Sequence, residues 1–277
     1  MRKYAIVLCL LGSMGAWSQK AFQGKAVYQS KTTFDMNAFG NDMSEERKKR
    51  IKERMKNFLE KTYTLHFTTK QSVYKEEAKL QAPGSRGSRF GGFSGGETTF
   101  KDVQEPKVLA AVEFFGKKFL IEEPKEKLAW EMTGETKQIG KYTCFKATLL
   151  KKNTAFDWRS MRRKPRGKKK EKQPEKKRPK EILVTAWYTP QIPVSSGPGS
   201  YWGLPGLILE INEGRTTLLC SEIVLNPQEK IALKEPTKGE KVTREEYNKI
   251  IKKKMEEMRE MFQRRRGGGN GRGRGRF

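Results

Sequence analysis

The chain has 277 residues and a formal net charge of +27, which results from 59 Lys and Arg against 32 Asp and Glu. With 35% hydrophobic and 33% charged residues, it is too polar to form a bundle of membrane-spanning helices, and its length suits one domain with tails or two small domains. Its single histidine, His66, leaves little material for zinc sites with two or three histidines or for histidine-based catalytic relays. An enzyme of this composition would have to rely on carboxylates or on an unusual catalytic group.

The first 18 residues have the features of a signal peptide. Arg2 and Lys3 precede an apolar run over residues 4–11, and Ala16 and Ser18 are small residues at the two positions that signal peptidase reads. The alternative, an uncleaved membrane anchor, would need about 20 apolar residues, and this run is shorter. We therefore expect cleavage after Ser18, export to the periplasm and no transmembrane segment in the mature chain.

The spacing of hydrophobic residues in the N-terminal half changes from strand to helix and back. Residues 24–30 alternate in polarity, which predicts a strand. Residues 44–61 place apolar side chains at helical spacing and predict an amphipathic helix. Residues 63–74 return to period two, with Leu65 on the apolar face and His66 on the polar face, so a catalytic or ligand role for His66 is not favoured.

Strand patterns without long helices between them dominate the second half. Residues 108–150 predict several short strands separated by Gly and Pro. Strand character resumes at residues 182–189 and 207–225, where Glu213 and Gly214 favour a hairpin turn. This succession predicts an antiparallel sheet.

A final helix is predicted over residues 243–262. Thr243 and Glu246 have the spacing of a capping box, and the apolar residues that follow form one stripe that should lie on the sheet. The alternative for part of this stripe is a soft-metal site formed by three methionines at the same spacing, Met255, Met258 and Met261. Packing explains them better, because the stripe continues with side chains that bind no metal.

Most of the positive charge lies in two runs of low complexity. Residues 159–180 hold 13 Lys and Arg with two Glu, and residues 264–276 hold six Arg and no acid. We expect disorder in the insert at 159–180, in the tail at 263–277 and in the Gly-rich loop at 84–96. The candidate anion-binding residues are Arg162, Arg163, Lys164, Lys168, Lys169, Lys170, Arg264, Arg265 and Arg266. They suit an anionic glycolipid or polymer such as lipopolysaccharide, and nucleic acid is the less favoured partner of an exported protein.

Two cysteines, Cys144 and Cys220, remain after the signal peptide with Cys9 is removed. A disulfide between them and a pair of buried thiols in neighbouring strands both fit the sequence, because it does not show whether their backbones approach within bonding distance. Neither cysteine has a nearby histidine or a CxxC spacing, so catalytic and metal-binding roles are weaker interpretations.

No catalytic constellation is evident in the sequence. Ser195 and Ser196 do not stand in a G-x-S-x-G nucleophile elbow and are more typical of a turn. Glu122 and Glu123 would point to opposite faces of a strand, which does not suit a catalytic carboxylate pair. We therefore expect no enzyme activity and no metal or cofactor, and keep a hydrolase of unseen mechanism as an alternative.

A long motif lies within residues 186–214. The run Gly203-Leu204-Pro205-Gly206-Leu207-Ile208 follows Trp187-Tyr188-Thr189-Pro190, Ile192-Pro193 and Gly197-Pro198. In this order the chain resembles the GLPGLI family of exported Bacteroidota proteins over about residues 24–262. The resemblance implies a secreted or periplasmic protein, often encoded beside TonB-dependent outer-membrane receptors, and it brings no catalytic residues.

The motif also has a physical interpretation of its own. Gly203 and Gly206 permit backbone angles closed to other residues and Pro205 restricts the turn, so a rigid turn should feed a buried strand. The aromatic and apolar residues around it could either wall an apolar groove or pack in the core, and packing is favoured. The residues concerned are Trp187, Tyr188, Pro190, Ile192, Pro193, Tyr201, Trp202, Gly203, Leu204, Pro205, Gly206, Leu207 and Ile208.

Together these observations predict one α+β domain over residues 19–262. Its large curved antiparallel sheet would form a half-open barrel, like that of periplasmic lipoprotein carriers, covered by two amphipathic helices. We expect a non-catalytic binding or accessory protein of the cell envelope, with an envelope protein such as a TonB-dependent receptor as partner. The alternative function is the binding of anionic glycolipid or polymer through the basic runs.

Overall fold

The computed structural model describes residues 22–33, 44–77, 96–105, 107–152, 181–228, 231 and 233–267. In chain order, these residues form β1 (Gln23–Thr32), α2 (Glu45–Leu59), β2 (Glu60–Thr68), β3 (Gln71–Glu76), β4 (Thr98–Asp102), β5 (Lys107–Phe114), β6 (Lys117–Pro124), β7 (Glu131–Ile139), β8 (Tyr142–Lys152), β9 (Glu181–Thr189), β10 (Leu207–Glu213), β11 (Thr216–Leu225), β12 (Glu240–Val242) and α3 (Arg244–Gly267). The expected signal peptide, the basic insert and residues 84–95 of the expected loop lie outside the described residues.

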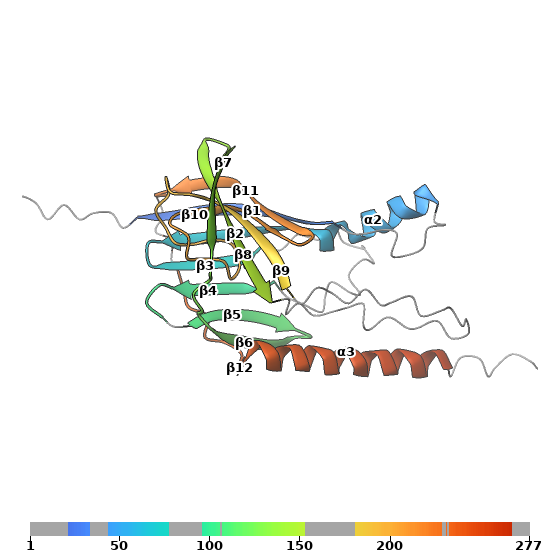
Figure 1. The fold of residues 1–277 in the computed structure, drawn as a ribbon. Coiled ribbons are helices and arrows are strands. Elements are labelled where there is room, and N and C mark those ends of the chain that lie inside the picture. The colour runs from blue at the N-terminus through green and yellow to red at the C-terminus, as the bar shows by residue number, and fades with distance from the viewer. Residues whose placement is uncertain are drawn as a thin grey trace, which may run out of the picture.

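All the strands just named belong to one open, curved sheet. Its order is β12-β6-β5-β4-β3-β2-β1-β11-β10-β9-β8-β7, and every pair is antiparallel except β12 with β6. The register shifts between Val27 and Tyr28 where β1 meets β11, and between Ile208 and Glu210 where β10 meets β9. Such bulges bend a sheet, and β8 and β9 cross β2 to β4 at a steep angle (Figure 1). The prediction of a large curved antiparallel sheet is confirmed.

The period-two pattern at residues 63–74 forms a hairpin of β2 and β3 rather than one strand. The hydroxyl of Thr68 accepts hydrogen bonds from the backbone amides of Lys70 (3.3 Å) and Gln71 (3.0 Å), which closes the turn between the two strands. The alternation of polarity continues through this tight turn, which is why the sequence pattern did not reveal it.

Two strands were not predicted, namely β4 and β12. They are short, at 5 and 3 residues, and alternation over so few residues is a weak signal. Strand β4 lies between β3 and β5 and contains Lys101, a residue of the candidate site.

Helix α3 begins as predicted and continues further than predicted. The amide of Thr243 donates to the carboxylate of Glu246 at 2.8 Å and the Glu246 amide donates to the Thr243 hydroxyl at 3.2 Å, which confirms the capping box. The predicted helix end at residue 262 is wrong, because α3 runs to Gly267. Glutamine and arginine at residues 263–266 favour helix, and the glycine run then ends it.

The N-terminal part of α3 packs against the sheet. Its apolar residues Tyr247, Ile250, Ile251 and Met255 contact the buried cluster of β5 and β6, whereas the Met261 side chain is 60% exposed. Packing therefore accounts for the stripe as far as Met255. The helix then extends past the edge of the sheet (Figure 1).

Arg244 links the start of α3 to the sheet through ion pairs. Its guanidinium donates to both carboxylate oxygens of Glu123 in β6, at 2.9 and 3.2 Å, and to Glu97 at 3.1 Å. Burial opposes the charge of Arg244, but its hydrogen bonds to the two carboxylates and the negative charge of these groups outweigh burial and raise the pKa of Arg244.

Helix α2 does not cover the sheet as expected. It follows Ser44 and leads straight into β2, and it contacts β1 and β2 but otherwise projects away from them (Figure 1). Because α2 and β2 are joined with no loop between them, the helix continues beyond the end of its strand and does not fold back over the sheet face.

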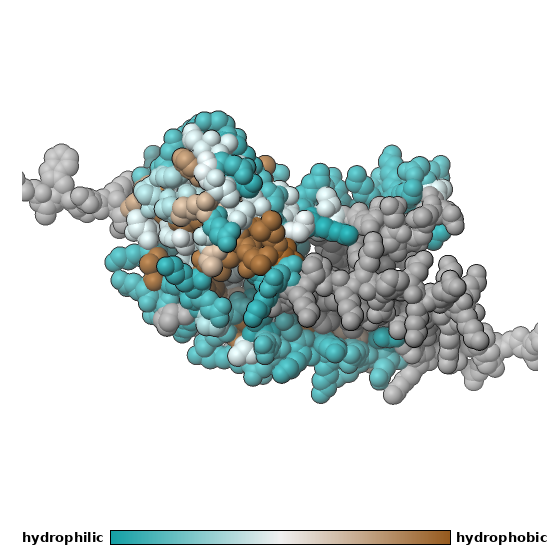
Figure 2. Space-filling view, viewed as in Figure 1, coloured by the Kyte–Doolittle hydropathy of each residue, from teal (hydrophilic) through white to brown (hydrophobic). Residues whose placement is uncertain are grey.

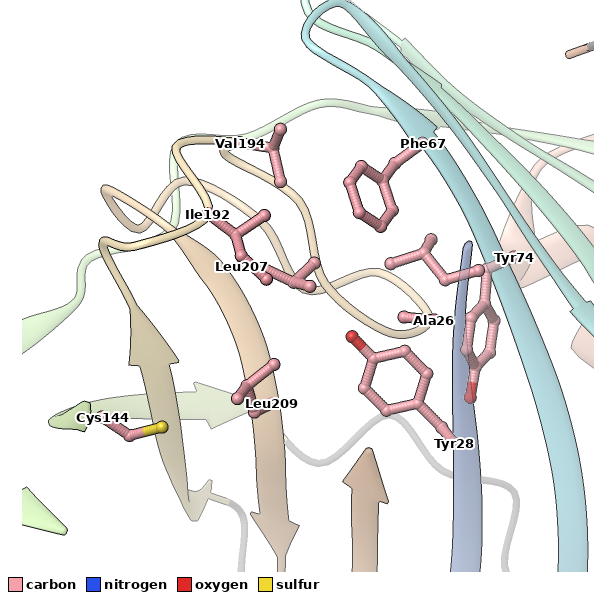
Figure 3. Packing of buried hydrophobic residues seen from close by; sticks show 10 residues of the cluster. Ala26, Tyr28, Phe67, Tyr74, Cys144, Ile192, Val194, Leu207 and Leu209 are labelled. Atoms are coloured by element: carbon pink, nitrogen blue, oxygen red, sulfur yellow. The ribbon is translucent and has the colours of Figure 1, made fainter. Parts of the chain in front are cut away.

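The motif segment, defined here as residues 190–208, fills space between β1 to β4 and β8 to β10. Ile192, Val194 and Leu207 face Tyr28 and Phe67 in one buried cluster (Figure 3). The segment folds back on itself, because the amide of Leu207 donates to the Ile192 carbonyl at 3.0 Å. The hydroxyl of Tyr28 also donates to the backbone carbonyl of residue 208 at 2.7 Å. The part of the core between β1 to β3 and β8 to β10 is thus built around this segment.

Candidate functional site

A buried lysine, Lys101, holds the motif segment to the sheet. Its side chain leaves β4 and its ammonium donates to the backbone carbonyls of Gly197 (2.8 Å), Gly199 (2.9 Å) and Tyr201 (2.9 Å). An ammonium has three N–H donors, so each donor has an acceptor. Only 5% of the residue is exposed. We call this arrangement the Lys101 clamp.

Burial brings the titration of Lys101 into the neutral range. The loss of water around the amine penalises its charged form and lowers the pKa of Lys101 to about 7. A neutral amine carries two N–H groups, so deprotonation leaves one of the three carbonyls without its donor. The protonation state of Lys101 therefore decides whether the clamp is complete.

Beside the clamp lies a small depression, which we call the lysine pocket. It is lined by Lys70, Ser72, Lys101, Asp102, Val103, Lys125, Ser195, Ser196 and Trp202. The ammonium of Lys125 donates to the backbone carbonyls of Asp102 and Val103 and lies 5.1 Å from the centroid of the Trp202 ring. The hydroxyl of Ser72 is buried, and no hydrogen-bond partner is found for it among the described residues.

The one carboxylate of the lysine pocket is already hydrogen-bonded. Asp102 accepts from the side chain of Gln71 at 2.6 Å and from the amide of Gln104 at 2.8 Å. Partial burial raises the pKa of Asp102, but these hydrogen bonds and the charge of Lys125 outweigh it, so that its pKa is lowered overall. The pocket consequently presents positive charge and hydroxyl groups.

A second, larger hollow of about 160 Å³ lies between the β7–β8 turn and β11, and Cys220 lines it. Cys220 is half-buried and Cys144 is buried, and both are free thiols, so a Cys144–Cys220 disulfide is not formed. Burial raises the pKa of Cys144 to about 11 and that of Cys220 to about 12. Both are therefore protonated at neutral pH, which makes them weak nucleophiles and weak metal ligands.

His66 lies on the polar face of β2, as predicted, while Leu65 and Phe67 on the other face are buried. Burial, assisted by the charge of Lys25, lowers the pKa of His66, so the imidazole is neutral at pH 7. Its Nδ1 atom is buried and has no hydrogen-bond partner among the described residues.

Most of the motif residues that could have walled an apolar groove are buried in the core. Their burial favours the alternative interpretation, which is packing. Seven of them are buried: Tyr188, Ile192, Tyr201, Leu204, Gly206, Leu207 and Ile208. Trp187 and Trp202 are half-buried, and Pro190, Pro193, Gly203 and Pro205 are exposed. They do not line a common apolar groove, and Trp202 alone among them lines either of the two hollows described above.

The two glycines of the motif have different structural roles. Gly203 has a φ of 94°, which favours glycine. A Cβ atom at Gly206 would lie 2.2 Å from the carbonyl oxygen of Thr189, so no side chain fits there. The turn and its close approach to β9 thus both depend on glycine, in agreement with the rigid turn predicted.

The predicted anion-binding residues are only partly placed. Arg162, Arg163, Lys164, Lys168, Lys169 and Lys170 lie outside the described residues, and Arg264, Arg265 and Arg266 belong to the last turns of α3. Sequence patterns did not reveal the site residues Lys70, Ser72, Lys101 and Lys125, because a lysine in a short polar strand looks like part of a solvated face. The meeting of four chain segments at the lysine pocket has no local sequence signal.

Neither a membrane-spanning helix nor a metal-binding cluster is found among the described residues. No described helix combines the length and the apolar character needed to cross a membrane. Within the same residues, no group of three or more His, Cys, Asp or Glu side chains is arranged to hold a metal ion.

Part of the chain is similar to a known protein family. Residues 130–210, from β7 into β10, match a family described as protein of unknown function (Porph_ging). No curated protein matches the chain. Two crystal structures of PNGF-II, in space groups C2 and P21, are similar to 83% of the chain with TM-scores of 0.48 and 0.47 and identities of 12% and 13%. The chain spans about a third of the length of PNGF-II, because 33% of that chain is covered.

Proposed function

We propose that the chain is a non-catalytic accessory protein of the cell envelope that works through surface contacts with an envelope protein. In this proposal the expected signal peptide directs the chain to the periplasm, and a TonB-dependent outer-membrane receptor is the candidate partner. The GLPGLI motif at residues 203–208 lies within the region matched by the family of unknown function, which supports a GLPGLI assignment.

The observation that carries this proposal is the filled interior of the sheet. In a half-open barrel of the lipoprotein-carrier kind, a ligand would lie against the curved sheet. Here Ile192, Leu204 and Leu207 occupy that place with at most 1% exposure, and the Lys101 clamp holds their segment. Neither hollow reaches the roughly 300 Å³ typical of a small-molecule site. We therefore favour the outer surface as the working part of the domain.

To test the proposal, mature protein would be cross-linked in intact cells and the partners identified by mass spectrometry. We expect one envelope protein to be enriched over a control with a disrupted motif segment, such as Gly206→Val, and to bind the purified domain at high salt. Turnover of a substrate that is lost when one carboxylate of the domain is mutated would contradict the proposal and favour the hydrolase alternative.

A second candidate function, the binding of anionic glycolipid, is supported by an exposed apolar pair. Leu150 in β8 is paired with Leu183 in β9, and these residues are 62% and 60% exposed. A hydrophobic patch is visible over β8 and β9 (Figure 2). The two strands flank the segment that contains the basic run at 159–180, so apolar and cationic groups are joined in sequence as an anionic amphiphile would require.

Vesicle binding tests this second function. The Leu150→Ser/Leu183→Ser variant should bind anionic vesicles more weakly than the chain with the matched substitution Leu219→Ser, which changes an exposed leucine of β11. Binding should also fall steeply with salt, because it depends on charge. Equal binding by both variants at all salt concentrations would rule out a role for the leucine pair.

A further inference from the structure

We propose that the lysine pocket binds an oxyanion of the phosphate class. The site belongs to the folded domain and is independent of both the basic runs and the proposed envelope function. Its lining comes from four parts of the chain, namely the β2–β3 hairpin, the end of β4, Lys125 after β6, and the motif segment.

Charge selects an anion for this pocket. Lys70 and Lys125, joined by Lys101 when it is protonated, bring positive charge to one depression, against the carboxylate of Asp102. That carboxylate already accepts hydrogen bonds from Gln71 and Gln104. A ligand with negative charge is therefore favoured over a neutral one or a cation.

The hydrogen-bond donors of the pocket are of two kinds. When Lys101 is protonated, its three N–H groups are directed to backbone carbonyls, so this residue contributes charge and no free donor. Lys125 donates to two carbonyls and retains a third N–H group. The hydroxyl of Ser72 is a donor as well, and at 1% exposure it has no partner among the described residues.

The unpartnered Ser72 hydroxyl is the strongest single indication of a ligand. A buried polar group without a partner is costly, and native structures seldom leave one unexplained. Ser72 lines the pocket next to Ser195 and Ser196, so an oxygen atom entering there would accept from a hydroxyl group. Serine hydroxyls and lysine ammonium groups are common partners of phosphate oxygens.

The size of the pocket limits how the anion enters. Its volume is about 10 Å³, which is close to the space that one oxygen atom of water size requires. One oxygen of the anion would therefore reach Ser72, while the remaining oxygens stay at the mouth near the exposed Lys70 and the half-buried Lys125. This geometry suits a terminal phosphate group, either free or on a lipid headgroup.

The decisive variant is Ser72→Ala, because it leaves every charge in place. Removal of an unpartnered buried hydroxyl should leave the melting temperature unchanged or slightly higher. Inorganic phosphate would be titrated calorimetrically into the full chain at constant ionic strength. We expect Ser72→Ala to weaken phosphate binding about tenfold, as does Lys125→Gln, while Ser221→Ala and Lys118→Gln, which alter exposed residues, bind as the parent does.

Vesicles containing phosphatidic acid distinguish the two sources of phosphate. A loss in Ser72→Ala that is confined to the vesicles, with inorganic phosphate unaffected, would assign the site to a lipid headgroup. A loss confined to inorganic phosphate would assign it to a free anion. If Ser72→Ala binds both probes as well as Ser221→Ala does, the pocket holds water only and the proposal is overturned.

Discussion

Replacing Lys101 by methionine should loosen the motif segment from the sheet. Methionine keeps most of the apolar stem of lysine but leaves the carbonyls of Gly197, Gly199 and Tyr201 without their donor. Of these residues Gly197 and Tyr201 are buried, and an unsatisfied buried carbonyl costs about 1–3 kcal/mol. The variant no longer has to bury a charge, and this gain offsets most of the cost, so we expect a net loss of about 1 kcal/mol in the free energy of unfolding at pH 7.

Urea denaturation followed by tryptophan fluorescence would measure this loss. The side chain of Trp130 donates to the backbone carbonyl of Trp202 at 2.8 Å, so both rings report on the end of the motif segment. Lys75→Met, at an exposed lysine of the neighbouring strand β3, is the matched control and should unfold like the parent chain. If Lys101→Met is as stable as Lys75→Met and its native fluorescence is unchanged, the clamp does not hold the segment.

The remaining predictions concern titration, the start of α3, the basic insert and the thiols. The pKa of Lys101 falls from about 10.5 in the unfolded chain to about 7 in the folded chain. Between pH 7 and pH 10.5 the unfolded chain therefore holds a proton that the folded chain lacks. The free energy of unfolding that is due to this group consequently rises with pH. The free energy of unfolding of the parent chain, relative to that of Lys101→Met, should thus rise by about 1 kcal/mol per pH unit between pH 7.5 and 9.5. If urea denaturation shows the same difference between the two proteins at every pH, the buried amine stays charged. Arg244→Ala should lower the unfolding free energy by about 2 kcal/mol, since it breaks contacts with two carboxylates, whereas Arg259→Ala at an exposed position of α3 should be silent in the same assay. Replacing residues 159–180 by a short Gly-Ser turn should change stability by about 1 kcal/mol or less and weaken binding to anionic vesicles; a melting temperature many degrees lower would show that this segment packs on the domain. In native protein a thiol reagent should modify Cys220 slowly at pH 7 and Cys144 only on unfolding, and mass spectrometry that finds Cys144 modified first would contradict the burial described here.

Local sequence patterns determined the elements of this fold where they were long enough to be read. The alternation in β1, β9, β10 and β11 and the capping box of α3 depend on neighbours within a few residues, so side-chain spacing and hydrogen-bonding chemistry suffice to predict them. The same holds for the motif turn, in which Gly203 adopts a positive φ. The short strands β4 and β12 were not predicted, because they contain too few residues to show a period in their polarity.

Only the tertiary structure decided what the motif segment and the lysines do. Lys101 is nearly 100 residues from the carbonyls that it binds, and no spacing along the chain reports that approach. Whether residues 190–208 would wall a groove or fill the interior likewise depended on the curvature of the sheet, which arises from bulges between distant strands. Contacts of this kind form because the sheet curls around the segment, so they depend on the packing of the whole domain rather than on any local pattern.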